Sequence, residues 1–202
     1  MKLYFKAGAC SLSPHIVLHE SGLDFTVVSV DLKTKRTEQN EDFFTLNAKG
    51  KVPALALDDG TVLTETVAIV QYIADRKPDR QLLAPTGCLT RYQTLEWLSF
   101  IATELQEPFY ALFRSGVPDE YRLQVREQLQ QKFRWVNDQI EGKQWLMGLH
   151  FTVADACLFT VMRWAKPVEL ALSGLDALNG WYERVAERPA VAAALQGEGL
   201  KE

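Results

Sequence analysis

A single cysteine stands where a short apolar segment gives way to a predicted helix near the start of the chain. Residues 3–5 (LYF) are apolar, and segment 7–22 (AGACSLSPHIVLHESG) places Cys10 just before the helix. Unpaired N–H groups and the positive end of the helix dipole favour a thiolate there, and can lower a cysteine pKa from about 8.5 to below about 7.5. A buried, inert cysteine under a sheet is an equally good interpretation of position alone. Ser13 stands where a second cysteine would complete a dithiol motif, so redox chemistry here would need an outside thiol.

Two other segments carry groups that could bind a ligand. In segment 50–55 (GKVPAL), a cis Val52–Pro53 bond would turn the backbone N–H and C=O of Val52 outward, to pair with an extended ligand. An ordinary trans proline on an edge strand is the alternative. In segment 63–69 (LTETVAI), Glu65 and Thr66 stand at a helix start, where N–H groups and a hydroxyl can bind a carboxylate. A plain helix cap is the alternative for this pair.

Two patterns in the second half of the chain are better explained by structure. Thr152 and Asp155 are three residues apart before an apolar run, which is typical of a capping box worth about 1 kcal/mol. We expect this pair to align a core helix and to take no part in catalysis. A group of aromatic residues could line an apolar pocket, although aromatic side chains in helices more often belong to the core. The group comprises Phe109, Tyr110, Phe113 and Trp164.

The elements that must position these residues change in kind along the chain. In the first part, β-branched runs alternate with helical patterns, and Asp58-Asp59-Gly60 joins two apolar runs as a hairpin turn. Predicted strands lie at 2–5 and 25–32 and in a hairpin over 52–65, and predicted helices lie at 11–22 and 66–76, with a short one in the second half of 33–47. This order predicts a compact mixed α/β domain.

The second part of the chain is predicted to be entirely helical. Prolines and a glycine in segment 77–87 (KPDRQLLAPTG) indicate a linker. A long helix over 91–113, interrupted only at Pro108, an amphipathic helix over 119–142 and a buried helix over 152–165 follow. The predicted domains are therefore residues 1–80, a linker at 81–86, and an all-α domain at 87–202.

Composition excludes several classes of protein. The chain has 202 residues, a formal net charge of −4 and no basic run, so nucleic acid is not expected as a partner. No apolar run approaches the roughly 18 residues that span a bilayer, so we expect no membrane association. Three cysteines and three histidines show no metal-ligand spacing, and we expect no metal. The odd cysteine count argues against a disulfide framework and for a cytoplasmic protein.

Four segments together resemble the bacterial beta-class glutathione transferases, in register over nearly the whole chain. They are KLYFKAGACSLSPHIVLHESG, NAKGKVPAL, LTETVAIVQYIAD and FTVADACLFTVMRWA. The resemblance implies a glutathione transferase fold, with a thioredoxin-like, glutathione-binding N-terminal domain and an all-helical C-terminal domain that holds the hydrophobic co-substrate and the dimer contacts. It also implies a homodimer, with glutathione as co-substrate and no prosthetic group.

The resemblance assigns roles to residues of the first domain. Cys10 matches the cysteine that lies beside the glutathione sulfur and can form a mixed disulfide with it. Pro53 matches the family's cis proline, so Val52 would pair its backbone with the cysteinyl part of glutathione. Glu65 and Thr66 match the residues that hold the γ-glutamyl end, and the family often has serine at the second position.

Other assignments include residues that match the family and residues that depart from it. Lys35 matches a basic residue near the glycine carboxylate. Ser99, Thr103 and Glu104 fall on a helix that reaches the glutathione site, partly from the neighbouring subunit, and close relatives have asparagine in place of Ser99. Gln106 stands where the family often has histidine. Glutamine forms hydrogen bonds but cannot titrate near neutral pH, so the rate and its pH dependence are open.

These residues support three functional hypotheses. The first is a glutathione transferase (EC 2.5.1.18 type) that conjugates reduced glutathione to hydrophobic electrophiles in detoxification, with Phe109, Phe113 and Trp164 as candidate electrophile contacts. The second is a glutathione-dependent thiol–disulfide oxidoreductase acting through Cys10. The third is a non-catalytic scaffold for hydrophobic ligands. The ordered motifs favour the first, because a scaffold would not need a glutathione site.

Overall fold

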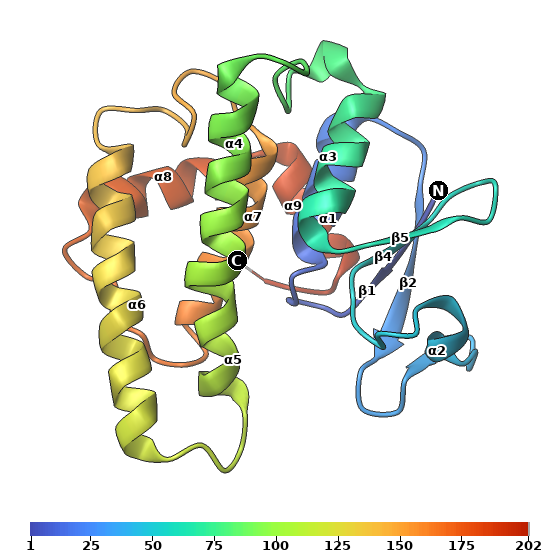
Figure 1. Ribbon diagram of the computed structural model, residues 1–202, viewed down its shortest axis with the longest axis horizontal. Coiled ribbons are helices and arrows are strands. Elements are labelled where there is room, and N and C mark those ends of the chain that lie inside the picture. Colours follow the sequence, from blue (N-terminus) through green and yellow to red (C-terminus); the bar gives the residue numbers. More distant parts are fainter. Residues whose placement is uncertain (202) are drawn as a thin grey trace. The chain divides into compact units, whose positions relative to one another are not determined.

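The computed structural model describes residues 1–201, and this part of the chain forms two compact units. The first unit comprises Met1–Leu83 together with the C-terminal segment that starts at Glu187, and the second comprises Ala84–Ala186. Figure 1 shows the sheet and helices of the first unit and the long helices of the second. Glu202, the last residue of the predicted helical domain, lies outside the described residues.

The first unit is built on a mixed sheet in the order β3-β2-β1-β4-β5. Its strands within residues 1–201 are β1 (Lys2–Phe5), β2 (Thr26–Asp31), β3 (Arg36–Thr37), β4 (Ala54–Ala56) and β5 (Val62–Thr64). β1 pairs in parallel with β2, whereas β1 with β4, β2 with β3 and β4 with β5 are antiparallel. The predicted strands and the predicted hairpin are therefore confirmed, and β3 is an addition.

Helices cover both faces of this sheet. They are α1 (Leu12–Ser21), α2 (Phe43–Leu46), α3 (Thr66–Arg76), the short 3₁₀ helix η1 (Pro78–Arg80) and α9 (Pro189–Gly197). α1 packs against both α3 and α9, which lie together in Figure 1. Side chains alternate along β1, so Tyr4 packs with Phe43 of α2 on one face while Phe5 contacts His15 of α1 on the other. Burial on both faces explains why β1 reads as a continuous apolar run.

The C-terminal segment does not pack where the predicted domain boundary placed it. The sequence assigns all of 87–202 to one helical domain, but α9 belongs to the compact unit that contains the sheet. Arg188, just before α9, pairs with Glu20 of α1 through Nε at 2.5 Å and Nη2 at 2.9 Å. Helical periodicity alone does not say which core a terminal helix joins, because that depends on contacts distant in sequence.

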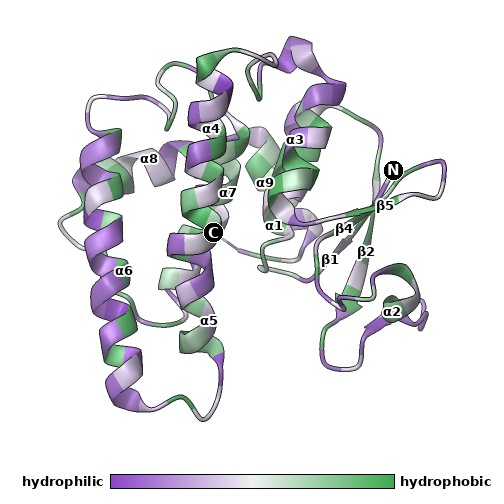
Figure 2. Cartoon of the chain, viewed as in Figure 1, coloured by the Kyte–Doolittle hydropathy of each residue, from purple (hydrophilic) through white to green (hydrophobic). Residues whose placement is uncertain are grey.

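The second unit consists of helices that follow one another closely. They are α4 (Leu89–Phe100), the π-helix η2 (Ile101–Gln106), α5 (Glu107–Phe113), α6 (Asp119–Ile140), α7 (Val153–Met162), the 3₁₀ helix η3 (Arg163–Ala165) and α8 (Asp176–Ala186). In α6 the predicted apolar face is buried, while most of the helix is hydrophilic in Figure 2. Every residue of α7 is buried, as predicted for a core helix.

Within residues 1–201, no helix is both long and apolar enough to cross a membrane. In the same range, no group of three or more histidine, cysteine, aspartate or glutamate side chains could hold a metal ion.

Candidate functional site

Cys10 lies in a tight turn between β1 and α1, as the sequence predicts. Ala9 N–H donates to the Lys6 carbonyl at 2.9 Å, and the Ser11 hydroxyl closes the same loop by bonding the backbone of Lys6. The Cys10 side chain is 9% exposed, and its Sγ donates to the Val52 carbonyl at 3.3 Å. The structure thus places the thiol at the helix start and aims it at the loop that carries Pro53.

Of the two alternatives that position left open for the Cys10 thiol, burial favours the neutral form. Burial raises the pKa of the Cys10 thiol, and the negative charge of Glu65 raises it further. A hydrogen bond from the Thr66 side chain and backbone hydrogen bonds at Cys10 and Ser11 lower the pKa, but they do not offset the burial. Desolvation disfavours the charged form more than the helix terminus stabilises it. Cys10 is therefore a neutral thiol near pH 7 that acts as a hydrogen-bond donor.

The Val52–Pro53 peptide bond is cis, as the family resemblance implies. Val52 is buried, and its carbonyl accepts the hydrogen bond from the Cys10 thiol. The loop before it is held by Asn47, whose Nδ2 donates to the Lys51 carbonyl at 2.7 Å. The structure therefore brings Cys10, Val52 and Pro53 together.

Glu65 and Thr66, at the start of α3, add a third segment to this cluster. Glu65 has a φ of +72°, in the left-handed region that a non-glycine residue rarely adopts, and Thr66 begins α3. Strain of this kind costs about 1–3 kcal/mol and is concentrated at functional sites. The Glu65 side chain is exposed and forms an ion pair with Lys49. Thr66 reaches the Cys10 thiol with its side chain, so the pair is more than a plain helix cap.

Lys35 lies at the edge of the same cluster. Its Nζ donates to the Gly50 carbonyl at 2.7 Å, two residues before Val52. The side chain is half-buried, and its ammonium stays beside the loop that carries the cis proline. The first unit therefore brings together six predicted residues: Cys10, Lys35, Val52, Pro53, Glu65 and Thr66.

A long-range contact that the sequence did not predict supports the cysteine loop. Glu198, just after α9, accepts a hydrogen bond from Gly8 N–H at 2.8 Å and lies 3.1 Å from His15 Nδ1. Both side chains are almost completely buried. His15 is thus a packed, hydrogen-bonded residue, and Glu198 ties the C-terminal segment to the turn before Cys10.

The remaining predicted glutathione contacts lie in the second unit, along α4 and η2. Ser99, Thr103 and Glu104 are exposed, and Gln106 Nε2 donates to the Tyr110 hydroxyl at 3.0 Å. η2 is a π-helix, an irregularity that is frequent at functional sites. Side chains of this segment are therefore available at the surface of the second unit.

The candidate electrophile contacts divide into buried and exposed rings. Phe113 is 48% exposed and Tyr110 is 38% exposed, and both pack against Trp164. Phe109 has no exposed surface; its ring stacks on Phe113 and meets Trp164 in a T-shaped arrangement. Phe109 therefore supports the aromatic cluster but cannot contact a ligand, which corrects its predicted role.

Thr152 and Asp155 form the predicted capping box at the start of α7. Asp155 is fully buried and accepts hydrogen bonds from Thr152 N–H, Leu146 N–H and Trp181 Nε1 at 2.8–2.9 Å. The structural role expected for this pair is confirmed, and it extends to anchoring the loop before α7 and helix α8.

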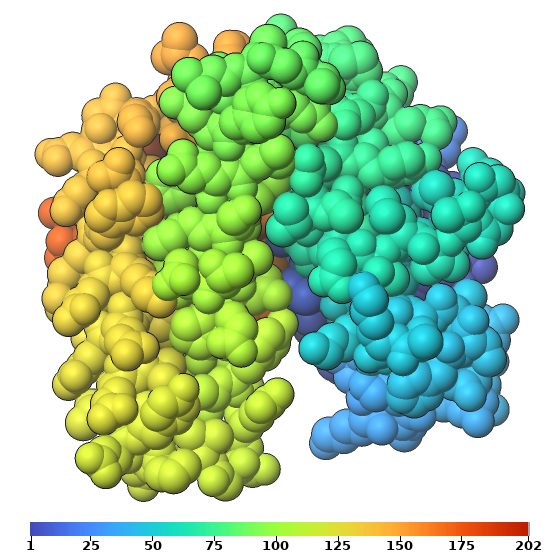
Figure 3. Space-filling view, in the orientation of Figure 1, coloured from blue at the N-terminus to red at the C-terminus, as the bar shows by residue number. Residues whose placement is uncertain are grey.

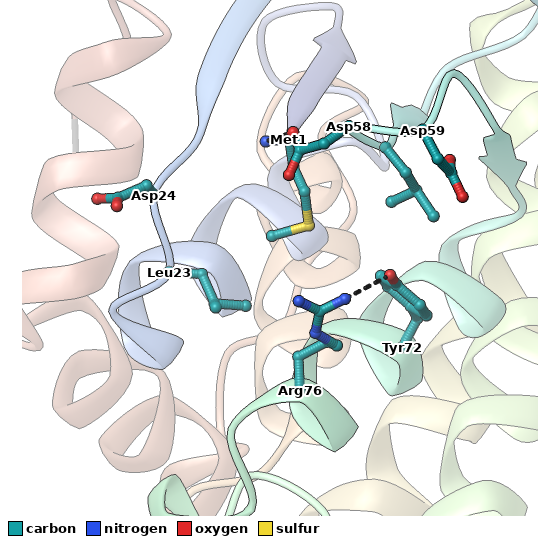
Figure 4. A pocket seen from close by; sticks show the side chains of 8 residues that line it. Met1, Leu23, Asp24, Asp58, Asp59, Tyr72 and Arg76 are labelled. Atoms are coloured by element: carbon teal, nitrogen blue, oxygen red, sulfur yellow. Dashed lines mark hydrogen bonds and ion pairs between the residues drawn. The ribbon is translucent and has the colours of Figure 1, made fainter.

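A separate cavity of the first unit takes no part in this cluster. It has a volume of about 360 Å³ and is lined by charged side chains that include Asp24, Asp58 and Asp59. Arg76 lines it and donates to the Tyr72 hydroxyl at 3.1 Å (Figure 4). None of the predicted site residues lines this cavity.

A cysteine before α1, a cis proline before β4 and a following helical unit together define a thioredoxin-like protein of the glutathione transferase fold. Residues 7–76 match the family model described as glutathione S-transferase, N-terminal domain, and residues 100–189 match that of the C-terminal domain. The chain belongs to the glutathione S-transferase family.

Known relatives resemble the chain over its whole length. The glutathione S-transferase GstA of Escherichia coli O157:H7 is 57% identical over 201 residues and covers 100% of both chains. The beta-class glutathione S-transferase of Sphingomonas chungbukensis has a TM-score of 0.96 at 42% identity, again covering 100% of both chains. A sphingomonad glutathione S-transferase solved in complex with glutathione has a TM-score of 0.95 at 42% identity, with the same coverage. The chain is thus similar to bacterial beta-class enzymes.

Proposed function

We propose that the protein is a glutathione transferase that conjugates the thiol of reduced glutathione to hydrophobic electrophiles. The observation that carries the proposal is the cluster in which Cys10 donates to the Val52 carbonyl beside the cis Pro53, with the Thr66 side chain lowering the pKa of the same thiol. A solved relative at 42% identity binds glutathione, which supports the same ligand here. We assign the thioredoxin-like unit to glutathione and the helical unit to the electrophile.

Each part of glutathione has a matching group in the cluster. The Val52 backbone pairs with the cysteinyl residue as an added strand would. The Glu65 carboxylate takes the γ-glutamyl ammonium, and the Thr66 hydroxyl with the N–H groups at the start of α3 takes the γ-glutamyl carboxylate. Lys35 takes the glycine carboxylate. A single extended tripeptide would therefore meet groups of the right charge along its length.

Cys10 acts in this proposal as a neutral thiol beside the glutathione sulfur. Its raised pKa favours hydrogen-bond donation over attack on a second sulfur. Catalysis then comes from holding the glutathione thiol against the electrophile, since orientation can supply several kcal/mol, up to about 7–11, of the barrier. The same pKa counts against a disulfide oxidoreductase that attacks through Cys10.

The second unit supplies the other contacts. Ser99, Thr103, Glu104 and Gln106 remain proposed glutathione contacts, some of them from a neighbouring subunit of a homodimer. The exposed rings of Tyr110 and Phe113, with Trp164 behind them, form the proposed surface for an apolar electrophile. We infer a cytoplasmic role in detoxification from this substrate class.

The experiment is the conjugation of glutathione to 1-chloro-2,4-dinitrobenzene, scanned over pH. We expect glutathione-dependent turnover by the wild type, and we expect Cys10→Ala to lower kcat/KM by less than about tenfold, the loss of one hydrogen bond. Cys88→Ala, which removes an exposed cysteine of the other unit, is the matched control. Absence of glutathione-dependent turnover would contradict the proposal, and complete loss in Cys10→Ala would restore Cys10 as the reacting group.

A further inference from the structure

We propose that Lys49 is a positioning residue for glutathione recognition. It holds the Glu65 carboxylate where the γ-glutamyl ammonium binds, and it links the loop before Pro53 to the start of α3. The inference rests on the proposed function, because it takes Glu65 as the group that binds the γ-glutamyl end.

Two contacts of one ammonium group carry the inference. Lys49 Nζ lies 2.5 Å from Glu65 Oε1 and 2.9 Å from Thr64 Oγ1. Glu65 has the positive φ of +72° described above, and Thr64 is its neighbour at the end of β5. The Lys49 ammonium therefore contacts the side chains of two successive residues of the strained turn. These two contacts fix the direction of the Glu65 carboxylate.

Lys49 is itself held by the loop that carries the cis proline. Its backbone N–H donates to Asn47 Oδ1 at 3.1 Å, and Asn47 Nδ2 donates to the Lys51 carbonyl at 2.7 Å. Asn47 is 5% exposed, so this anchor is fixed by packing. The residue after Lys51 is Val52. Lys49 thus joins the two segments that would bind the cysteinyl and γ-glutamyl residues of one glutathione.

The exposure of the Lys49–Glu65 ion pair indicates that it orients the Glu65 carboxylate and does not stabilise the fold. The Lys49 and Glu65 side chains are 52% and 68% exposed, and exposed pairs contribute only about 0–1 kcal/mol to folding. Glutathione, however, brings a carboxylate and an ammonium to this turn. A Glu65 charge without a nearby cation would repel the incoming carboxylate, whereas Lys49 offsets that charge and leaves the second carboxylate oxygen to meet the ammonium.

The test compares two thiols that differ only in the γ-glutamyl residue. Conjugation to 1-chloro-2,4-dinitrobenzene is measured with glutathione and with cysteinylglycine, in the wild type, Lys49→Met and Lys49→Arg. For Lys49→Met we expect the KM for glutathione to rise about five- to tenfold with kcat within about twofold, and kcat/KM for cysteinylglycine to change by less than about twofold. Lys49→Arg, which keeps the charge, should restore most of the loss. Lys2→Met is the control, because Lys2 is an exposed lysine of the same unit without a side-chain ion pair in residues 1–201.

The outcomes separate this inference from the proposed function. An unchanged KM for glutathione in Lys49→Met, or equal losses with both thiols, would overturn the role of Lys49 while leaving the transferase intact. A wild type that does not distinguish glutathione from cysteinylglycine would overturn the assignment of Glu65, and the inference with it. Non-additive effects of Lys49→Met and Glu65→Gln in the double variant would support a direct coupling.

Discussion

At the scale of single residues, the position of Cys10 follows from sequence but its ionisation does not. The turn between a strand and a helix is readable from the pattern, and so is the absence of a second cysteine. The pKa depends instead on how completely neighbouring segments bury the sulfur, and here burial outweighs the helix terminus and the Thr66 hydrogen bond. A motif can therefore predict where a thiol lies without predicting its charge.

The raised pKa of Cys10 leads to a prediction about reactivity. In a Cys88→Ala background, which removes an exposed competing thiol, alkylation of Cys10 by iodoacetamide should be slow at pH 7. Its rate should rise with pH to a midpoint above the ordinary thiol pKa. The measurement is the pH profile of alkylation followed by mass spectrometry. A midpoint below neutral pH would contradict the raised pKa and would support a Cys10 thiolate at neutral pH.

The same shift has a consequence for stability whose sign can be worked out. The folded-state pKa lies above the unfolded value, so the native state binds more protons in the interval between the two. The stability contributed by the neutral thiol is complete below the unfolded pKa and is lost as pH rises through the folded pKa. The difference in free energy of unfolding between the wild type and Cys10→Ala, measured by denaturant unfolding, should be constant below this alkaline interval, and the advantage of the wild type should fall as pH rises through it. A wild-type advantage over Cys10→Ala that increases as pH rises through this interval would contradict this sign.

The residues that the sequence pattern does not reveal share one property: their contacts depend on loop conformation or on segments distant in sequence. Lys49 is two residues beyond Asn47 in an irregular loop, and its partner Glu65 comes from the other end of a hairpin. Glu198 meets Gly8 across 190 positions. Periodicity describes regular elements, so it identified Thr66 at a helix start but could not pair side chains from loops.

At the scale of elements, the interruption predicted at Pro108 takes a particular form. The helix changes to a π-helix over Ile101–Gln106 just before the proline. Pro108 has no N–H to donate to the carbonyl four residues earlier, that of Glu104, and Lys132 of α6 donates to it at 3.0 Å. Lys132 also pairs with the Glu104 carboxylate at 2.8 Å. The proline was visible in the sequence, whereas the compensating lysine on another helix was not.

The start of α7 gives the clearest prediction about folding. Asp155→Ala should lower the free energy of unfolding by about 3–5 kcal/mol, because it leaves buried N–H donors of Leu146, Thr152 and Trp181 without an acceptor. Thr152→Ala should cost about 1 kcal/mol. Urea unfolding of both variants measures these differences.

The control for this series is Asp138→Ala, an exposed aspartate of α6 in the same unit. It should change the free energy of unfolding by less than about 0.5 kcal/mol. Equal effects of Asp138→Ala and Asp155→Ala would show that the buried network does not determine the stability of α7. Because the sequence predicts only the Thr152–Asp155 pair, the contact with Trp181 is where structure adds most to the expected cost.

At the scale of the whole molecule, aromatic side chains, one of them exposed, gather on two helices of the helical unit. Trp97, Phe100 and Trp135 form a ring cluster across α4 and α6, with centroids 4.8–5.9 Å apart, and Trp135 is 45% exposed. Tyr92 and Leu89 of α4 are more exposed still. Figure 3 shows the side chains of α4 and α6 next to one another at the surface of this unit. Exposed apolar clusters of this kind mark interaction sites.

This surface leads to the prediction that the protein is a homodimer joined through α4 and α6. The wild type should sediment at twice the mass of one chain, and Trp135→Asp should shift it to the monomer, because a buried carboxylate opposes association. Affinity for glutathione should then fall about threefold or more, since the resemblance places part of the Ser99–Glu104 contact in the neighbouring subunit. Leu149→Asp, at a residue 78% exposed in a loop of the same unit, should leave both properties unchanged. The measurements are sedimentation velocity and glutathione titration of the wild type and both variants. A monomeric wild type, or a Trp135→Asp variant that remains a dimer, would mean that this aromatic surface does not form the dimer interface.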